Sequence, residues 1–288
     1  MSKVYIGCGA GFAGDRFDAA VPIVRALADV TGERFLIYEV LAERTLAIAQ
    51  RLKRENPDQG YSPFLDTYLP GVLADCHRHG IRIVTNMGAA NPIGAARRVH
   101  VLAGELGIRG LKVAAVTGDD LLLSMAEAEI RREPVIEGIT LDGRAIVAAN
   151  AYLGARPVAD ALATGAHVVL VGRTTDAALS LGPLMHVHGW KSEDLDRLAQ
   201  GNVCGHLPRA RTRWRARNSR HRWCVRAVVP SASANRCAWK CSAPKRYSTA
   251  TAGAVARVLF KAGAVNIACA QPCAVQSARW RSRCRTKC

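Results

Sequence analysis

Acidic residues are missing from the end of this chain: the last 81 of its 288 residues, from Pro208 to Cys288, contain no aspartate and no glutamate. The same segment holds 19 of the 40 Lys and Arg residues, seven of the ten cysteines and four of the five tryptophans. The first 207 residues hold all 23 acidic residues and have a net charge of −2. The net charge of +17 is therefore the sum of a near-neutral body, residues 1–207, and a strongly basic tail, residues 208–288.

Two functional explanations of the basic, Cys-, Trp- and Arg-rich tail are open. Basic residues alternate along Arg209–Arg217 around Trp214, which is typical of an arm that neutralises nucleic-acid phosphates. The tail also contains three Cys-x-x-x-Cys pairs, Cys237/Cys241, Cys269/Cys273 and Cys284/Cys288. That spacing falls within the loose range for zinc, but the tight Cys-x-x-Cys pair is absent.

A shifted reading frame is the third explanation, and we favour it. GC-rich DNA read out of frame yields Arg, Ala, Pro, Cys, Trp and Ser, few acids and no hydrophobic period, which matches the tail and departs from ordinary domain composition. The tail is then expected to be irregular or disordered. Gly253–Ala268 is the one tail segment whose apolar pattern predicts a helix.

The body lacks long apolar runs, a secretory leader and a disulfide framework. No run approaches the roughly 20 apolar residues that span a bilayer. The N-terminus starts directly with a strand-like run and has no basic region or cleavage site of a signal peptide. Its three cysteines, Cys8, Cys76 and Cys204, are too few for a disulfide framework. The body is therefore predicted to be a cytoplasmic, reduced protein without a membrane span.

Several catalytic signatures are also missing. The chain has no P-loop, no Gly-x-Ser-x-Gly nucleophile turn and no His-Glu-x-x-His zinc helix. The pairs His77-x-His79 and His186-x-His188 have the wrong spacing for a shared helix face, so we predict surface or core histidines and no metal site. The sequence identifies no cofactor.

Short apolar runs alternate with amphipathic stretches throughout the body. The predicted strands are Val4–Ile6, Arg34–Val40, Ile81–Thr85, Leu111–Val116 and His167–Val171. The predicted helices are Asp15–Val30, a stretch ending at Glu55, Phe64–Arg78, Pro92–Leu106 capped by Asn91, Asp119–Arg131, Asn150–Ala163 with a break at Pro157, and Asp176–His186. Short extended pieces are expected within Val135–Ile146. This alternation predicts an α/β fold with a mostly parallel sheet flanked by helices on both faces, in Rossmann-like layers.

Polar residues follow each predicted strand. In open α/β sheets, ligands bind beyond the carboxyl ends of the strands. The segments at those ends are Gly7–Arg16, Glu39, Asn86–Asn91, Thr117–Asp120 and Gly172–Asp176. The rule indicates where a site would lie, but it does not name the chemistry.

The first of these loops has the spacing of a dinucleotide-binding fingerprint. Its three glycines are Gly9, Gly11 and Gly14. Glu39 ends the next predicted strand, where an acid could bind a ribose. Asp15 and Arg16 crowd the expected helix start, however, and the Asp15 carboxylate would repel a pyrophosphate. The alternatives are an anion site, a nicotinamide site, or a tight glycine turn with Asp15 as the helix cap.

Asp119 and Asp120 are adjacent carboxylates at the end of the fourth predicted strand. Such a pair could bind a hard cation, or each could raise the pKa of the other for acid–base chemistry. The structural alternative is a helix cap followed by an acid in the first turn.

The loop after the last predicted strand combines Arg173 with Asp176. Arg173 could bind a carboxylate or phosphate through two hydrogen bonds, and Asp176 could act as a base or orient one. The structural alternative is a loop ion pair with Asp176 as a helix cap. Asn86, after the third strand, could donate to a carbonyl or a developing oxyanion.

Taken together, the strand-end loops resemble those of the acyclic terpene utilisation protein A (AtuA) family. The segments that carry the resemblance are Ile6–Arg16, Thr85–Pro92, Val116–Asp120, Asn150–Ala155, Gly172–Leu179, Leu181–Leu184, Gly189-Trp190 and Gly201–Leu207. The resemblance covers Lys3–Leu207. Similar members continue after Gly-His with a glycine-rich stretch, whereas this chain departs at Pro208. The resemblance thus agrees with the composition in indicating truncation or a frame shift after about residue 207.

The resemblance implies a role in the catabolism of acyclic isoprenoids and branched acyl-CoA compounds. We therefore predict an enzyme or enzyme subunit with a small-molecule substrate of the acyl-CoA class. The residues assigned to catalysis are Asp119, Asp120 and Asp176, and those assigned to substrate binding are Gly9, Gly11, Gly14, Asp15, Arg16, Asn86 and Arg173. The alternatives are a nucleic-acid-binding protein led by its tail or a non-functional truncated product. A core edge exposed after residue 207 would favour self-association.

Overall fold

The computed structural model describes residues 3–133 and 143–215 and four tail segments, 224–228, 236–242, 257–261 and 264–268, with side chains described up to residue 206. The body contains one all-parallel sheet in the order β1-β2-β3-β5-β4. Its strands are β1 (Val4–Ala10), β2 (Glu33–Tyr38), β3 (Arg82–Thr85), β4 (Val113–Val116) and β5 (Val168–Val171). The predicted α/β class with a parallel sheet is confirmed.

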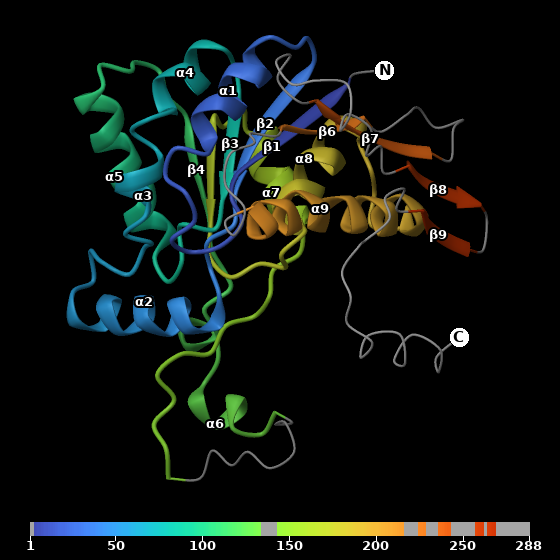
Figure 1. Cartoon of the computed structure of the whole chain (residues 1–288). Helices are drawn as coiled ribbons and strands as arrows, with labels where there is room; N and C mark the ends of the chain where they lie inside the picture. Colours follow the sequence, from blue (N-terminus) through green and yellow to red (C-terminus); the bar gives the residue numbers. More distant parts are fainter. Residues whose placement is uncertain are drawn as a thin grey trace.

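Helices cover both faces of the sheet (Figure 1). One face packs against α1 (Ala20–Ala28), α3 (Leu65–Tyr68), α4 (Leu73–Arg78) and α5 (Pro92–Glu105). The other packs against α7 (Arg156–Ala163), α8 (Ala178–His188) and α9 (Leu195–Arg215). Side chains of β2 alternate between the two cores: Leu36 faces the first and Phe35 the second, and both are fully buried. The part of a strand that is buried on both faces must be apolar, which explains the run Phe35–Tyr38 after the partly buried Glu33 and Arg34.

The connections that follow the neighbouring strands β3 and β5 run to opposite faces of the sheet. The chain leaves β3 for α5 on one face and leaves β5 for α8 on the other. The two loops start side by side, because a Cβ on Gly88 would lie 2.5 Å from the Val171 carbonyl oxygen. In open α/β sheets, ligands bind where neighbouring connections diverge in this way. The topology thus positions a site beyond the ends of β3 and β5.

Helix α2 (Glu43–Glu55) lies across the carboxyl end of the sheet (Figure 1). Its apolar contacts form a small separate cluster comprising Leu41, Leu46, Ala49, Ala89 and Ala90. A single turn of 3₁₀ helix, η1 (Leu121–Leu123), and the short α6 (Glu127–Ile130) follow β4 and project further from the sheet. Polar side chains of α2 therefore face the loops that follow the strands.

Three predicted helices have different boundaries. Helix α1 begins at Ala20 rather than Asp15, because residues 11–19 form a loop that folds on itself. The stretch Phe64–Arg78 is divided into α3 and α4, since Pro70 cannot continue a helix. Helix α7 begins at Arg156, with Pro157 in its first turn, where proline is tolerated.

The helix predicted over Asp119–Arg131 is wrong. The chain forms only η1 and α6 there, and the two aspartates contact distant segments instead of capping a helix. The extended pieces expected within Val135–Ile146 lie partly outside the described residues, which omit 134–142.

The tail's described parts differ from the one element predicted there. Helix α9 continues through the composition break to Arg215. Strands β6 (Cys224–Val228), β7 (Arg236–Ser242), β8 (Arg257–Lys261) and β9 (Ala264–Ala268) form an antiparallel sheet in that order. The helix predicted over Gly253–Ala268 is thus wrong for the residues of β8 and β9. The side chains of the basic run and of the Cys pairs lie outside the described residues.

Among the helices that the structure describes, none is both long enough and apolar enough to cross a bilayer.

The predicted cap of α5 is confirmed. The Asn91 side chain accepts a hydrogen bond from the Gly94 N–H at 2.9 Å, and Pro92 occupies the first helical position. The Asn91 amide also donates to the carbonyl oxygens of Pro57 and Gln59 at 2.9 and 2.8 Å. One side chain therefore starts α5 and holds the turn that follows α2.

Asn91→Ala removes all three of these hydrogen bonds. We expect it to lower the free energy of unfolding by about 1–2 kcal/mol, as measured by urea unfolding. Asn202→Ala, at an exposed position of α9, is the matched control and should change stability by less than about 0.5 kcal/mol. Equal effects of the two substitutions would contradict the assigned role of Asn91.

Candidate functional site

The Asp119 carboxylate joins the end of β4 to the end of β5. Its Oδ2 accepts a hydrogen bond from the Arg173 backbone N–H at 2.7 Å and another from Asn150 Nδ2 at 3.1 Å. A Cβ on Gly172 would lie 2.4–2.6 Å from the Asp119 carboxyl atoms. The carboxylate therefore fits only because residue 172 has no side chain, and Asp119 is 3% exposed.

Burial raises the pKa of Asp119 above its ordinary value, because a charged carboxylate loses its hydration there. The hydrogen bonds from Arg173 and Asn150 lower the pKa and partly offset this effect, and the nearby Asp120 raises it. Asp119 consequently retains its proton to a higher pH than an exposed aspartate. A carboxyl group of this kind suits the role of a general acid.

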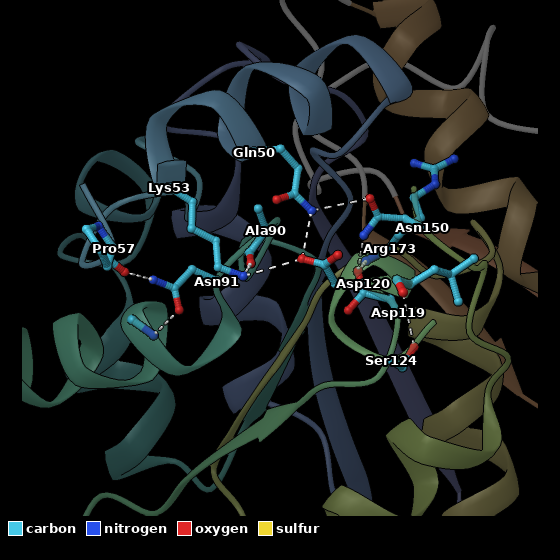
Figure 2. Close-up of polar contacts among 12 residues, drawn as sticks. Gln50, Lys53, Pro57, Ala90, Asn91, Asp119, Asp120, Ser124, Asn150 and Arg173 are labelled. Carbon is cyan, nitrogen blue, oxygen red and sulfur yellow. Dashed lines mark hydrogen bonds and ion pairs between the residues drawn. The ribbon is translucent and has the colours of Figure 1, made fainter. Parts of the chain in front are cut away.

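Asp120 points the other way, toward α2. Figure 2 shows Gln50 and Lys53 directed at its carboxylate. Asp120 Oδ2 accepts a hydrogen bond from Gln50 Nε2 at 3.0 Å and lies 3.4 Å from Lys53 Nζ. Lys53 also donates to the Ala90 carbonyl oxygen at 2.8 Å, which ties α2 to the loop after β3. Asp120 Oδ1 is buried and has no hydrogen-bond partner.

Arg173 is a buried cation at the end of β5, with a side chain that is 5% exposed. Its Nη1 donates to the Leu41 carbonyl oxygen at 2.7 Å. Its Nη2 donates to Glu43 Oε1 at 2.7 Å and to the Tyr152 hydroxyl. The guanidinium lies 4.0 Å from the centre of the Tyr152 ring, in cation–π geometry. Its Nε is buried without a hydrogen-bond partner.

Glu43 and Tyr152 cover Arg173 from the solvent side. The Tyr152 hydroxyl donates to the Glu43 carboxylate. This bond raises the pKa of Tyr152 and lowers the pKa of Glu43, because it stabilises the carboxylate and the neutral phenol. The Glu43 side chain is 75% exposed and Tyr152 is 52% exposed. Arg173 is therefore buried by two side chains that are themselves largely in water.

The glycine-rich loop does not have a dinucleotide-binding geometry. Strand β1 extends to Ala10, so Gly9 lies inside the strand, and a Cβ there would meet the Tyr38 ring at 2.5 Å. Asp15, which is 4% exposed, accepts the Gly11 N–H at 3.0 Å and the Arg16 N–H at 2.8 Å. The backbone donors that a pyrophosphate would need thus bind a carboxylate of the chain itself.

Further contacts give this loop a structural role. Gly14 has a φ of +80°, which favours glycine. The Tyr68 hydroxyl donates to the Asp15 carbonyl oxygen at 2.8 Å. The Arg16 guanidinium forms an ion pair with Asp18, and both side chains are exposed.

Asn86 holds the ends of β2 and β3 together. Its Oδ1 accepts from the Val40 N–H at 2.8 Å, and its Nδ2 donates to Glu39 Oε1 at 3.2 Å. Asn86 is 1% exposed, and both functions of its amide are engaged with the chain. Asp176 is partly exposed and lies three residues beyond Arg173, before α8.

The structure thus brings together Asp119, Asp120 and Arg173 among the residues predicted from the sequence. Five neighbours were not predicted: Glu43, Gln50, Lys53, Asn150 and Tyr152. Asn150 and Tyr152 lie in a segment that carried the family resemblance, and this signal could have identified them. Gln50 and Lys53 lie three residues apart on one helical face, but this pattern alone does not distinguish a site from a solvated surface.

The Asp119 carboxyl makes a testable contribution to stability. Because its pKa is raised above 3.8 in the folded chain, the folded state binds this proton more tightly than the unfolded state. The wild type should therefore lose stability relative to Asp119→Asn as the pH rises from 3.8 through the raised pKa, by up to about 1.4 kcal/mol per pH unit. Urea unfolding of both proteins across this pH range measures the difference.

Asp160→Asn is the matched control, because Asp160 is an exposed carboxylate paired with Arg156 on α7. The wild type should not lose stability relative to Asp160→Asn as the pH rises. A pH-independent difference for Asp119→Asn would show that Asp119 has no raised pKa.

Comparison with known proteins gives one family. The model of the acyclic terpene utilisation family protein AtuA matches residues 4–208. The match ends where the acid-free tail begins and includes every residue of the site described above. No curated protein and no solved structure gives a significant match to the chain.

Proposed function

Because the chain belongs to the acyclic terpene utilisation family, we propose that residues 1–207 form an enzyme, or a subunit of an enzyme, of acyclic isoprenoid catabolism. The proposed substrate is a small branched acyl compound, as its coenzyme A thioester. One observation carries the proposal: the buried residues Arg173 and Asp119 are joined through the Arg173 backbone N–H where the connections of β3 and β5 diverge, and Asp120 follows Asp119 directly. A cytoplasmic location is supported by the three body cysteines, which are buried thiols.

Arg173 is proposed to bind an anionic group of the substrate. Its charge is permanent, and its planar donors match the geometry of a carboxylate or phosphate. Its backbone N–H is fixed by Asp119, and its Nη1 by the Leu41 carbonyl. The guanidinium is therefore already oriented before a ligand arrives, which reduces the entropy lost on binding.

Asp119 and Asp120 are proposed to perform acid–base chemistry on the bound acyl group. The two carboxyl groups have different surroundings, since Asp119 accepts from amides and Asp120 lies beside the Lys53 ammonium. A pair with distinct environments can hold a proton on one member and accept a proton on the other. Proton transfer next to a carbonyl is the reaction class that this arrangement supports best, and Asp176 is proposed as a further acid–base group in the same loop.

The remaining predicted residues are proposed to shape the site. Asn86 holds the ends of β2 and β3, and Asp15 holds the loop after β1. Gly9, Gly11, Gly14 and Arg16 belong to that loop. We propose that these residues fix the positions of the strand ends, and that the strand ends determine how the substrate enters the site.

Binding of a branched acyl-CoA tests the proposal directly. We expect 3-methylbut-2-enoyl-CoA to bind the chain, and Arg173→Gln to weaken binding by about 10- to 100-fold, because a charge-assisted pair of hydrogen bonds is lost. Isothermal titration calorimetry measures both affinities. Arg156→Gln, which removes an exposed arginine of α7, is the matched control and should leave the affinity unchanged.

Asp120→Asn adds a second arm to this experiment. It preserves the shape of the side chain and removes its charge. The affinity for 3-methylbut-2-enoyl-CoA should therefore change by less than about threefold, while the rate at which the chain turns over the acyl-CoA falls by about 100-fold or more. If the acyl-CoA binds equally well to the wild type and to Arg173→Gln, the proposed substrate site is wrong.

We propose that residues 208–288 are translated out of the original reading frame. The absence of acidic residues and the end of the family match at residue 208 support this independently. Sequencing the gene across codons 195–215 should show a second frame that continues the body with a glycine-rich stretch. If no alternative frame continues it, the tail is genuine, and binding of nucleic acid and zinc should then be measured.

A further inference from the structure

We propose that Glu43 and Tyr152 are a displaceable cover on Arg173, and that Glu43 occupies the position of the substrate's oxyanion. The incoming group would be a carboxylate or a phosphate that replaces Glu43 on the guanidinium. This inference rests on the proposed function, because it concerns the anion site assigned to Arg173.

The burial of the two partners is strongly unequal. The Arg173 side chain is 5% exposed, whereas the Glu43 side chain is 75% exposed. A carboxylate that is mostly in water gains little from its ion pair, since solvent screens the attraction and the side chain loses rotational freedom. A buried guanidinium, by contrast, needs a counter-anion. Glu43 can therefore leave at small cost only if another anion takes its place.

The hydrogen bonds of Arg173 indicate where that anion would bind. Nη1 is fixed by the Leu41 carbonyl, so the opposite edge, formed by Nε and Nη2, remains for a ligand. Glu43 uses only Nη2 on this edge, at 2.7 Å, and Nε is buried without a partner. Carboxylates and phosphates commonly bind such an edge through two oxygens. An oxyanion would therefore satisfy the donor that Glu43 leaves unpaired.

Displacement requires only side-chain motion. Glu43 is the first residue of α2, and Tyr152 is 52% exposed, so both can rotate into solvent. The hydrogen bonds of Gln50 and Lys53 further along α2 hold the helix against Asp120 and the Ala90 carbonyl. The helix can thus stay in place while its first side chain moves, and Asp119 and Asp120 keep their positions.

Glu43→Gln in the full chain tests the proposal, because glutamine keeps the shape but not the charge of the cover. The probes are 3-methylbut-2-enoate and inorganic phosphate at low ionic strength, with affinities from isothermal titration calorimetry. We expect Glu43→Gln to bind the preferred probe about fivefold more tightly than the wild type, the scale of an exposed ion pair. The probe whose affinity increases more on Glu43→Gln identifies whether the oxyanion is a carboxylate or a phosphate.

Glu55→Gln is the matched control, because it removes an exposed carboxylate from the other end of α2. It should bind both probes as the wild type does. Arg173→Gln should bind neither, and its thermal unfolding midpoint shows whether it is folded. The Glu43→Gln measurement does not depend on that variant.

A second readout reports the cover itself. The bond to Glu43 raises the pKa of Tyr152, so Glu43→Gln should lower it. The tyrosinate absorbance, with Tyr152→Phe as the reference, measures this change. An unchanged Tyr152 pKa would mean that the cover does not form in solution, and the proposal would be wrong.

The outcomes separate this proposal from the proposed function. If Arg173→Gln abolishes binding but Glu43→Gln binds like the wild type or more weakly, the cover is refuted and the anion site stands. If wild type and Glu43→Gln both fail to bind either probe, the cover and the anion role of Arg173 are both wrong.

Discussion

The contact between Asp119 and Gly172 is the constraint on which the rest of the site depends. A carboxylate lies where any side chain at residue 172 would collide with it, and it accepts the N–H of the next residue, Arg173. This contact fixes the end of β4 against the end of β5. Arg173 then reaches the Leu41 carbonyl and Glu43, so the same contact also orients α2. The site is thus built outward from one buried hydrogen bond.

Much of the fold could be predicted from the sequence because its signals are local. Runs of β-branched and aliphatic residues such as Val168–Val171 indicate strands buried on both faces, and Asn91-Pro92 has the chemistry of a helix start. The strand-end rule also found Asp119, Asp120 and Arg173. The rest of the site could not be found in this way. Glu43 and Arg173 are 130 residues apart, and Gln50 and Asp120 are 70 apart, so only the tertiary fold joins them.

The failures of prediction have physical causes. The spacing of Gly9, Gly11 and Gly14 matches a phosphate-binding loop, but Asp15 supplies the anion from within the chain. Asp119 was compatible with a helix cap, yet its stronger partners are the amides of Arg173 and Asn150. In the tail, apolar residues within β8 and β9 pair as neighbouring strands, because a short apolar run does not by itself distinguish a helix from a strand.

The strand order also determines when the site can form during synthesis. Strand β5 lies between β3 and β4, so β4 leaves the ribosome without a partner and stays unpaired until β5 has been made. Domains generally begin to fold from their N-terminal side as the chain grows. Residues 3–105 can collapse first around β1, β2 and β3, whereas Asp119 lacks the backbone donor that joins it to β5 until Arg173 is translated. A ribosome that stops before residue 168 therefore releases a chain in which β4 has no partner strand and the site lacks Arg173.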